Sequence, residues 1–566
     1  MRCEIGDMRC EIGRLRDFFS WLNSCVFNIL TRYYNNVTSS RLFSQLQQCR
    51  LFEVILATTI MPPLRGYSRT SILATRYSLL FLLSINASAQ GTFTGSFQAD
   101  AQRYSEDKTL PYSTLDNRFG VNSYLTLAYQ YKNIRVGARA EGYFPPLLGY
   151  PQNLDGKGLV NRYINYRFHK NELTLGNFYE QFGSGMALRF QEQRFLGMDT
   201  SLDGFLFKRE TKGIKTKILA GKQRLGFAHA SAWLMGIDQE FSAQKWRLGL
   251  SAVNKNEAYD GILTSIKPNV FLWATRLRYQ GKQFDFSAEY ALKSSDPSVS
   301  NKFDARLGAG LYLNANYNIN KWSVSAIAKR IDNMDFRSQR GEALNNALVN
   351  YIPNTTKQHI YRLQTMYPYS SQVVGEVGGQ IDVIYSFDDE TTLNSNFSIL
   401  NGLNKAKYYR DFSTEYEKQW SEKWKTNFVA SYILFNKGVI LGGFPEIVKS
   451  LIFVADATYK IDKRKALRFE LQHLSTKQDK GNWAMALAEL SISPHYFFFA
   501  SDEINYKNFD SAEIIHYYNA GFALKHKSHR LSLSYGRVRE GLLCVGGVCR
   551  IVPAYKGLSL SVLSSF

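Results

Sequence analysis

The stretch QFDFSAEYALK, residues 283–293, carries the pattern that decides the fold of this chain. Every second side chain, from Phe284 to Leu292, is apolar, and the side chains between them include Asp285, Ser287 and Glu289. Successive side chains of a β-strand point to opposite faces, so this period of two predicts a strand with one apolar and one polar face. The same alternation recurs in segments 269–280, 424–435 and 530–536.

The connections between these strands alternate between short and long. Short turns occur at residues 132–134, 281–282 and 526–529, whereas residues 144–158 and 331–376 form much longer connections. Hairpins that close tightly at one end and loosely at the other are typical of outer-membrane barrels, which have short periplasmic turns and long external loops. We count about 24 strands, with a range of 22 to 26, because a few segments alternate weakly.

A membrane explains why such a sheet must close. The hydrocarbon core offers no water to unpaired N–H and C=O groups, so a spanning sheet cannot have free edges. No segment approaches the roughly 18 to 20 consecutive apolar residues of a spanning helix. The sequence therefore predicts an all-β fold, a large antiparallel transmembrane β-barrel over residues 90–566, located in the cell outer membrane. Outer-membrane lipid and lipopolysaccharide are its expected surroundings.

The chain ends on a strand-like segment that finishes with an aromatic residue. In YKGLSLSVLSSF, residues 555–566, apolar and serine residues alternate up to Phe566. A final strand ending in Phe resembles the signal by which outer-membrane barrels are recognised for assembly. We therefore predict that Phe566 is read by the barrel assembly machinery.

The basic balance of the chain does not indicate a nucleic-acid partner. Without residues 1–89, the chain holds 59 basic and 43 acidic residues, a net charge of +16. These charges are spread along the whole sequence, with no compact basic patch, zinc-finger spacing or basic helix. Solvated turns and inward-facing side chains account for them.

Residues 172–204, ELTLGNFYEQFGSGMALRFQEQRFLGMDTSLDG, begin like a strand and then become rich in charge. We expect Leu173–Phe182 to form the fifth strand and residues 183–204 the third external connection, which in general porins folds into the lumen. Gly183 and Gly185 would permit the inward bend. Five apolar side chains are expected to pack on the wall: Met186, Leu188, Phe190, Phe195 and Leu196.

The charged residues of this stretch are the predicted lumen constriction. They are Glu180, Arg189, Glu192, Arg194, Asp199 and Asp203. Opposed charges across a narrow lumen set a transverse field and hence charge selectivity. The sequence leaves a structural alternative open, in which the same side chains form a salt-bridge network that only braces a wide barrel.

Two cysteines remain in the mature chain, Cys544 and Cys549, on either side of Val-Gly-Gly-Val. Gly546 and Gly547 can adopt the positive φ values of a tight hairpin. By the strand count this hairpin lies in the last external loop, where oxidation is expected. We predict a disulfide between the two cysteines.

Three segments resemble a known family. They are GNFYEQFGSGMALRFQEQRFLGMDTSLDG at 176–204, CVGGVCR at 544–550 and VPAYKGLSLSV at 552–562. Together they resemble an uncharacterised family of large outer-membrane β-barrel proteins from Bacteroidota, known as a domain of unknown function. The resemblance covers residues 90–566 and implies a barrel in the outer membrane. It assigns no activity and no site residues.

Three functions can be weighed from the sequence. The first is a porin-like channel or binding protein for hydrophilic solutes, anionic ones included. The second is a structural or assembly barrel that docks lipoproteins or secretion machinery, with residues 331–376 as an external docking loop. An outer-membrane hydrolase ranks third because no nucleophile and base stand out together, so we expect no enzyme. The sequence indicates no cofactor and no metal site.

The N-terminal part carries an export signal that is displaced from the first residue. Residues 61–89 contain three arginines, a short apolar segment and the cleavage pattern Ala-Ser-Ala at 87–89, which together predict a signal peptide. Residues 1–60 precede it and open with two copies of MRCEIG. We interpret residues 1–60 as an upstream extension produced by a start codon placed too early.

N-terminal sequencing of the purified protein tests this interpretation. The expected mature N-terminus is Gln90, because cleavage follows the Ala-Ser-Ala pattern. Recovery of any peptide from residues 1–60 would contradict it.

Overall fold

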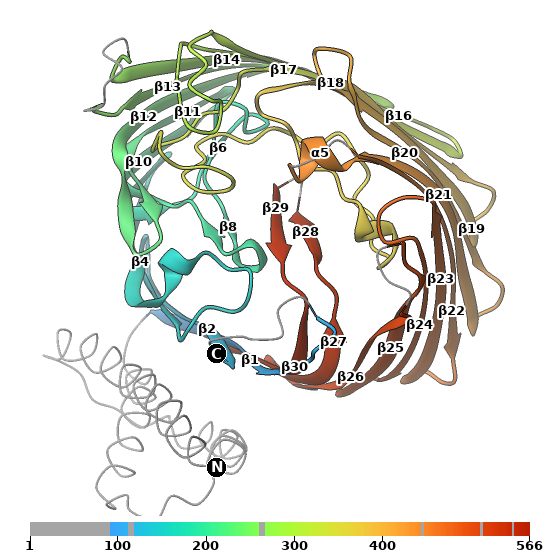
Figure 1. Ribbon diagram of the computed structural model, residues 1–566. Helices are drawn as coiled ribbons and strands as arrows, with labels where there is room; N and C mark the ends of the chain where they lie inside the picture. Colours follow the sequence, from blue (N-terminus) through green and yellow to red (C-terminus); the bar gives the residue numbers. More distant parts are fainter. Residues whose placement is uncertain (1–90, 111–117, 260–265, 443–445, 510–512, 546–547) are drawn as a thin grey trace, which may run out of the picture.

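The chain folds into one closed ring of β-strands. The computed structural model describes residues 91–110, 118–259, 266–442, 446–509, 513–545 and 548–566, so the expected signal peptide and the sequence before it lie outside the described residues. Twenty-four strands form a single sheet. The first, β1 (Thr92–Ser105), pairs with both β2 (Phe119–Tyr131) and β30 (Tyr555–Ser565), which closes the ring seen in Figure 1. The predicted all-β barrel and its strand number are confirmed.

All neighbouring strands are antiparallel, and each pairs with the next along the chain except where internal loops intervene. The other barrel strands are β3 (Ile134–Tyr143), β4 (Gly156–Phe168), β5 (Asn171–Phe178), β10 (Leu202–Thr211), β11 (Ile214–Leu225), β12 (Ala228–Ala243), β13 (Trp246–Asn256), β14 (Asn269–Gln280), β15 (Phe284–Lys293), β16 (Gly308–Ile319), β17 (Trp322–Asp332), β18 (Gly375–Ser386), β19 (Thr391–Asn401), β20 (Lys407–Gln419), β21 (Trp424–Asn436), β22 (Ile447–Lys460), β23 (Lys465–Thr476), β24 (Asn482–Ile492), β25 (Tyr496–Lys507), β26 (Ile515–His526) and β27 (His529–Val538).

The connections at one end of the barrel are uniformly short, as predicted. Between β2 and β3, Lys132 has a φ of 49°, and between β26 and β27, Lys527 has a φ of 52°. Positive φ values in two-residue turns match the right-handed twist of the paired strands, which is why these hairpins close tightly. This is the end at which the first strand begins and the last strand ends, the expected periplasmic end.

The connections at the other end differ more in length than the sequence analysis expected. Residues 144–155, 179–201 and 333–374 form long loops, but residues 226–227 alone join β11 to β12. A hairpin needs only two residues to turn, and Gly226, with a φ of 61°, supplies the left-handed backbone for it. The predicted alternation of short and long connections therefore fails at this position.

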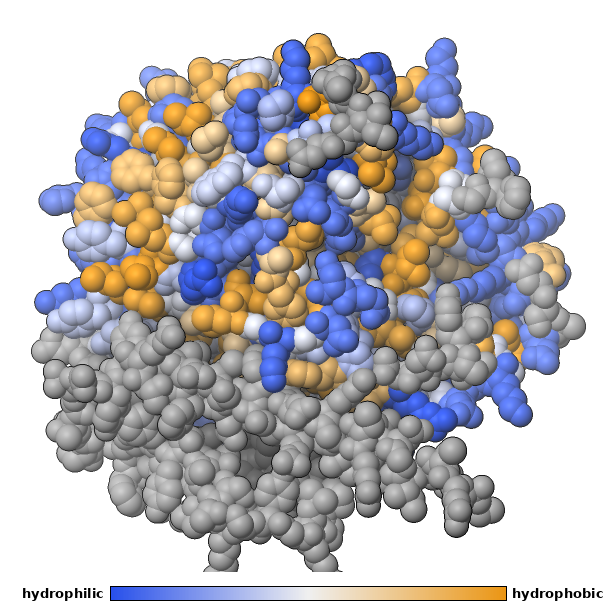
Figure 2. All heavy atoms as spheres, turned by 60° about the vertical axis from the view of Figure 1, so that its left-hand side comes forward, coloured by the Kyte–Doolittle hydropathy of each residue, from blue (hydrophilic) through white to orange (hydrophobic). Residues whose placement is uncertain are grey.

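The outer face of the barrel is apolar. Along β12, Trp233, Met235 and Ile237 are 52, 47 and 46% exposed, whereas Leu234 between them is fully buried on the inner side. Figure 2 shows one side of the barrel, where hydrophobic residues lie on the surface with hydrophilic residues among them. An exposed apolar exterior on a closed sheet matches the lipid-facing band of a membrane barrel.

Aromatic pairs mark the periplasmic end of this band. Trp246 lies 4.8 Å from Tyr279 between ring centroids, and Trp322 lies 4.4 Å from Tyr385. The ring of Phe566 lies 6.3 Å from that of Phe93, and its backbone exchanges hydrogen bonds with Gly95. Tyr and Trp rings suit the interface between hydrocarbon and water. The role of Phe566 as an assembly signal stays a prediction.

Short elements lie inside the ring. They are β6 (Gln181–Phe182), β7 (Leu188–Arg189), β8 (Glu192–Gln193), β9 (Met198–Asp199), α5 (Lys437–Ile440), β28 (Gly541–Val545) and β29 (Val548–Val552). Figure 1 shows several of them projecting across the lumen. No helix among the described residues is long and apolar enough to span a membrane. The lumen is thus occupied by loops, and the candidate site lies there.

Candidate functional site in the lumen

Loop 179–201 folds into the barrel and packs on its wall. Gly183 and Gly185 have φ values of 54° and 101°, and a side chain on Gly183 would meet the carboxylate of Glu289 on β15. Met186 and Leu188 are fully buried in an apolar cluster with inward residues of β10 to β15 and β17. The expected inward bend is therefore present. Phe195 is an exception to the predicted packing, because it is 68% exposed and borders a cavity.

The structure brings three of the six predicted constriction residues together. Glu192, Arg194 and Asp199 meet Arg139 and Glu141, both from β3. Arg139 Nη1 lies 2.8 Å from Glu192 Oε2, and Arg194 Nε lies 2.6 Å from Glu192 Oε1. These residues form one network of buried and half-buried charges inside the lumen.

Arg224 of β11 completes this network and balances its charge. It reaches Glu141 and Asp199 at 2.7 Å each, so three arginines face three carboxylates. Burial acts to raise the pKa of Asp199, but Arg224 and Arg139 outweigh it and hold the pKa below its usual value. Glu141, Glu192 and Asp199 lie close enough together for a metal ion, yet the neighbouring guanidinium groups already neutralise them.

The other three predicted residues lie elsewhere. Glu180 accepts ion pairs from Lys208 of β10 at 2.6 Å and Lys217 of β11 at 2.9 Å. Burial acts to raise the pKa of Glu180, but these two ammonium groups lower it overall. The guanidinium carbon of Arg189 lies 4.1 Å from the ring centroid of Tyr351.

Asp203 does not belong to the lumen. It is a residue of β10, which begins at Leu202, and it shares the face of Phe205, which is exposed, while Leu206 is buried on the inner face. Its partners, Arg162 at 3.5 Å and His229 at 3.1 Å, are exposed as well. The strand starts three residues earlier than expected, at Leu202 instead of Phe205, and side-chain alternation then turns Asp203 outward.

The largest part of the luminal filling comes from loop 333–374, which the sequence analysis treated as an external docking loop. Met334, Phe336, Val349 and Leu363 are fully buried. Their apolar side chains are removed from water by folding inward, so the external placement is wrong for this segment.

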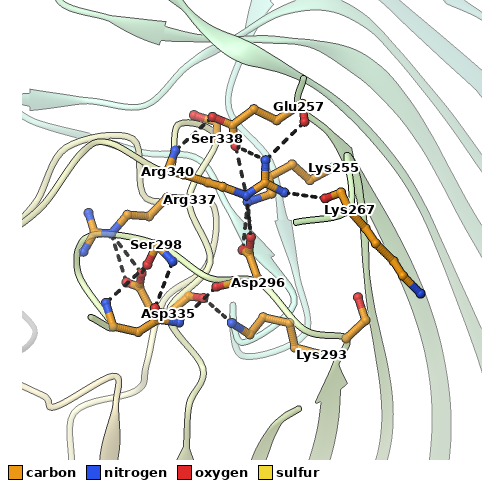
Figure 3. Close-up of polar contacts among 12 residues, drawn as sticks. Lys255, Glu257, Lys267, Lys293, Asp296, Ser298, Asp335, Arg337, Ser338 and Arg340 are labelled. Atoms are coloured by element: carbon orange, nitrogen blue, oxygen red, sulfur yellow. Dashed lines mark hydrogen bonds and ion pairs between the residues drawn. The ribbon is translucent and has the colours of Figure 1, made fainter. Parts of the chain in front are cut away.

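The first half of loop 333–374 is tied to the wall by the buried polar network of Figure 3. Lys255 of β13 lies 2.6 Å from Asp296, and Arg340 lies 3.2 Å from Glu257. Asp296 also lies 3.4 Å from Arg340, so one carboxylate joins the wall to the loop. Burying a charged side chain costs desolvation free energy, and an oppositely charged partner at this distance offsets that cost.

Two further residues extend this network along the loop. Asp335 accepts a hydrogen bond from Ser298 at 2.8 Å and lies 2.9 Å from Arg337. Lys293 of β15 donates to the Asp335 carbonyl at 2.5 Å. The network thus joins strands β13 and β15, the connection between β15 and β16, and the start of loop 333–374.

The second half of the loop contacts the opposite wall. The Leu363 amide donates to Gln472 of β23 at 2.7 Å, and Arg362 lies 3.0 Å from Glu503 of β25. In its first half, the Leu348 carbonyl accepts a hydrogen bond of 2.6 Å from Gln223 of β11. The loop therefore crosses the lumen from one side of the ring to the other.

The hairpin 541–552, formed by β28 and β29, also lies among these loops. The Asn345 amide donates to the Cys549 carbonyl at 2.6 Å. Arg550 donates to the carbonyls of Phe195 at 3.0 Å and Leu148 at 2.9 Å. The hairpin is therefore held by loops 144–155, 179–201 and 333–374 together.

Two cavities remain beside the hairpin. Cavity 1, about 740 Å³, lies against β1, β27 and β30, whose inner faces contribute Asp100 and the serines Ser532, Ser534, Ser559 and Ser561. Cavity 2, about 820 Å³, lies between the three loops and includes the network of Glu192 and Asp199. Tyr150, Leu542 and Arg550 line both cavities.

A closed sheet with an apolar exterior and a lumen filled by charged loops defines an outer-membrane β-barrel protein. The chain belongs to a family of unknown function (DUF6029), whose family model matches residues 68–566. A comparison with curated proteins found no match.

Solved structures of several outer-membrane barrels are similar in fold. The translocation pore of the P pilus usher PapC is 10% identical, with a TM-score of 0.43, over 84% of this chain and 99% of that chain. The siderophore receptor PirA from Pseudomonas aeruginosa is 7% identical, with a TM-score of 0.41, over 84% and 80%. OccAB3 from Acinetobacter baumannii is 9% identical, with a TM-score of 0.35, over 84% and 99%. At sequence identities of 7 to 10%, these similarities carry no information about the function of this chain.

The residues that hold loop 333–374 are not among the site residues predicted from the sequence. Lys255, Lys293 and Lys329 lie on the inner faces of their strands, near the external end, and all three are buried. One sequence feature could have identified these lysines: each lies on the polar face of an alternating segment, close to a long connection. Their partners could not be read in the same way, because Asp296 and Asp335 lie in loops without a period.

Substituting Asp296→Asn should loosen loop 333–374. The change removes one of the two carboxylates that Lys255 and Arg340 share and leaves them with Glu257 alone. Removing one partner of a buried ion pair costs about 3–5 kcal/mol. Hydrogen–deuterium exchange should become faster in residues 333–352 while the barrel strands stay protected.

Asp304→Asn is the matched control, because the partner of Asp304, Arg306, has a side chain that is 64% exposed. Exposed pairs contribute about 0–1 kcal/mol, so this variant should exchange like the unmodified protein. Equal exchange of residues 333–352 in both variants would show that the network does not anchor the loop.

Proposed function

We propose that this barrel is a porin-like channel that passes or binds hydrophilic solutes, with a preference for anions. The observation that carries the proposal is the lining of cavity 1, where four cations face a single carboxylate, Asp100. The cations are Lys357, Arg362, Arg539 and Arg550. The serines of β27 and β30 add a wall of short hydroxyl side chains on which a hydrated solute can form hydrogen bonds.

The low-dielectric surroundings of the lumen strengthen the effect of these charges. Clefts lined mainly by one sign of charge concentrate ions of the opposite sign. Glu415 and Glu503, which pair with Lys357 and Arg362, do not line cavity 1, so the cations face the cavity and their partners lie behind them. This arrangement favours an anion over a cation in the remaining lumen.

Reconstitution in planar bilayers tests the channel. Purified protein should produce discrete conductance steps, and a potassium chloride gradient should give a reversal potential of the sign that indicates chloride preference. The preference should weaken at high salt, since exposed charges are screened over about 3 Å at 1 M. A bilayer that stays sealed at high protein load would contradict the channel.

A second candidate is a plugged barrel that docks lipoproteins or secretion partners. The crossing of the lumen by loop 333–374, with Leu363 buried against one wall and Met334 against the other, supports a closed interior. Lipoprotein or secretion partners belong to this alternative, in which the same bilayer experiment should find no conductance. Both candidate functions share four further proposals. The barrel contacts lipopolysaccharide, Phe566 serves as an assembly signal, residues 61–89 act as the export signal, and the protein originates in Bacteroidota.

We also propose that Cys544 and Cys549 form a disulfide. The two residues are directly paired in the register of β28 and β29. The hairpin folds into the lumen and is not the external loop expected from the sequence, but an exported protein still passes through an oxidising compartment. Mass spectrometry of a digest made without reducing agent should find the two cysteine peptides linked. Two separate peptides, each with a free thiol, would contradict the disulfide.

A further inference from the structure

Arg550 stands at the place where the two luminal cavities meet. It is one of three residues that line both, together with Tyr150 and Leu542. Its guanidinium carbon lies 4.1 Å from the ring centroid of Tyr150, and it donates to two loop carbonyls at 2.9 and 3.0 Å. A planar cation fixed by a ring and two carbonyls has lost most of its rotational freedom before any ligand arrives.

The charge of Arg550 is not compensated as the charges of the neighbouring cations are. Among the described residues that line the two cavities, every other arginine has a carboxylate partner: Arg194 pairs with Glu192, Arg224 with Glu141, Arg337 with Asp335, and Arg362 and Arg539 with Glu503. Lys357 pairs with Glu415. No carboxylate of the described residues forms an ion pair with Arg550, which donates instead to the neutral carbonyls of Phe195 and Leu148.

An uncompensated cation in a half-enclosed site is unfavourable unless something neutralises it. Burial lowers the pKa of Arg550. Neutral carbonyls satisfy N–H groups, but they do not cancel a full charge. A bound anion can neutralise the positive charge that the carbonyls leave on Arg550.

Polar groups around the guanidinium suit an oxyanion. The Tyr104 hydroxyl donates to Gln102 at 2.9 Å, and the Gln102 amide donates to the Tyr555 hydroxyl at 3.0 Å. Tyr555 lines cavity 1 beside Arg550. A carboxylate or phosphate can accept hydrogen bonds from a guanidinium fork and from a hydroxyl at once.

We propose that Arg550 is the binding site for an oxyanion, a carboxylate or phosphate group of the solute, at the junction of cavities 1 and 2. The proposal rests on the proposed channel function and names the contact by which the solute is recognised on its path. Because Arg550 lines both cavities, a solute bound in either one can contact its guanidinium group. Arg550 is then a specificity residue, and the hairpin 541–552 is the element that places it in the lumen.

The competing explanation is purely structural: Arg550 ties the hairpin to loops 144–155 and 179–201 and contacts no solute. A second competing explanation is that any lumen cation would serve equally well. Substituting Arg539 tests this second explanation. Its loss removes one positive charge from cavity 1, as the loss of Arg550 does, while Glu503 keeps Arg362 as a partner.

The test uses the full barrel in detergent and in planar bilayers, with inorganic phosphate and citrate as probes. Calorimetric titration measures binding to the unmodified protein, Arg550→Gln and Arg539→Gln, and phosphate block of the chloride current is recorded in parallel. We expect Arg550→Gln to lose about ten- to hundredfold in phosphate affinity, the range for one charge-assisted hydrogen-bonding contact. Arg539→Gln should lose less than about threefold, as an electrostatic change at a distance.

Several outcomes overturn the proposal: no binding of phosphate or citrate to the unmodified barrel, equal losses in both variants, or unchanged affinity in Arg550→Gln. A sealed bilayer combined with probe binding that depends on Arg550 would refute the channel but support the anion site. If Arg550→Gln does not form a folded barrel, Arg550→Lys replaces it. Lysine keeps the charge but lacks the fork, so affinity equal to that of the unmodified protein would then overturn the proposal.

Discussion

The requirement that every backbone N–H and C=O be paired within the sheet governs this structure. Hydrocarbon supplies no substitute for a missing hydrogen bond, so the first strand has to meet the last. The pairing of β1 with β30 satisfies that requirement, and it joins residues more than 450 positions apart. The outward apolar face, the short turns at the periplasmic end and the enclosed lumen all depend on this closure.

Closure of 24 strands creates a second problem, because so wide a ring encloses more space than wall side chains can fill. Here loops 179–201 and 333–374 fill it with apolar clusters on two sides, and buried ion pairs such as Arg337 with Asp335 and Arg340 with Glu257 hold loop 333–374 in place. Among the described arginines and lysines that line the two cavities, all except Arg550 pair with a carboxylate. Arg550 is therefore a better candidate for the proposed solute contact than the paired charges of the predicted constriction.

The candidate site could be predicted from the sequence only in part. Glu192, Arg194 and Asp199 were placed in a luminal loop and lie there, joined to Arg139 and Arg224. Asp203 was misplaced because a shift of three residues in the strand boundary moves it into β10, where alternation decides its direction. The length of loop 333–374 predicts an external loop, but length alone does not show on which side of the barrel rim a loop lies. Its apolar residues, such as Met334, Phe336 and Leu363, indicate burial.

The strands, their number, the closure of the sheet and its membrane setting can all be predicted from the amino-acid sequence. These follow from a period of two and from connection lengths, which are local properties that each segment carries independently. The segments that occupy the lumen, in contrast, depend on tertiary contacts. These contacts, such as Arg362 with Glu503 or Arg550 with the Leu148 carbonyl, join irregular loops to residues 141 and 402 positions away, and no local pattern encodes such a pairing.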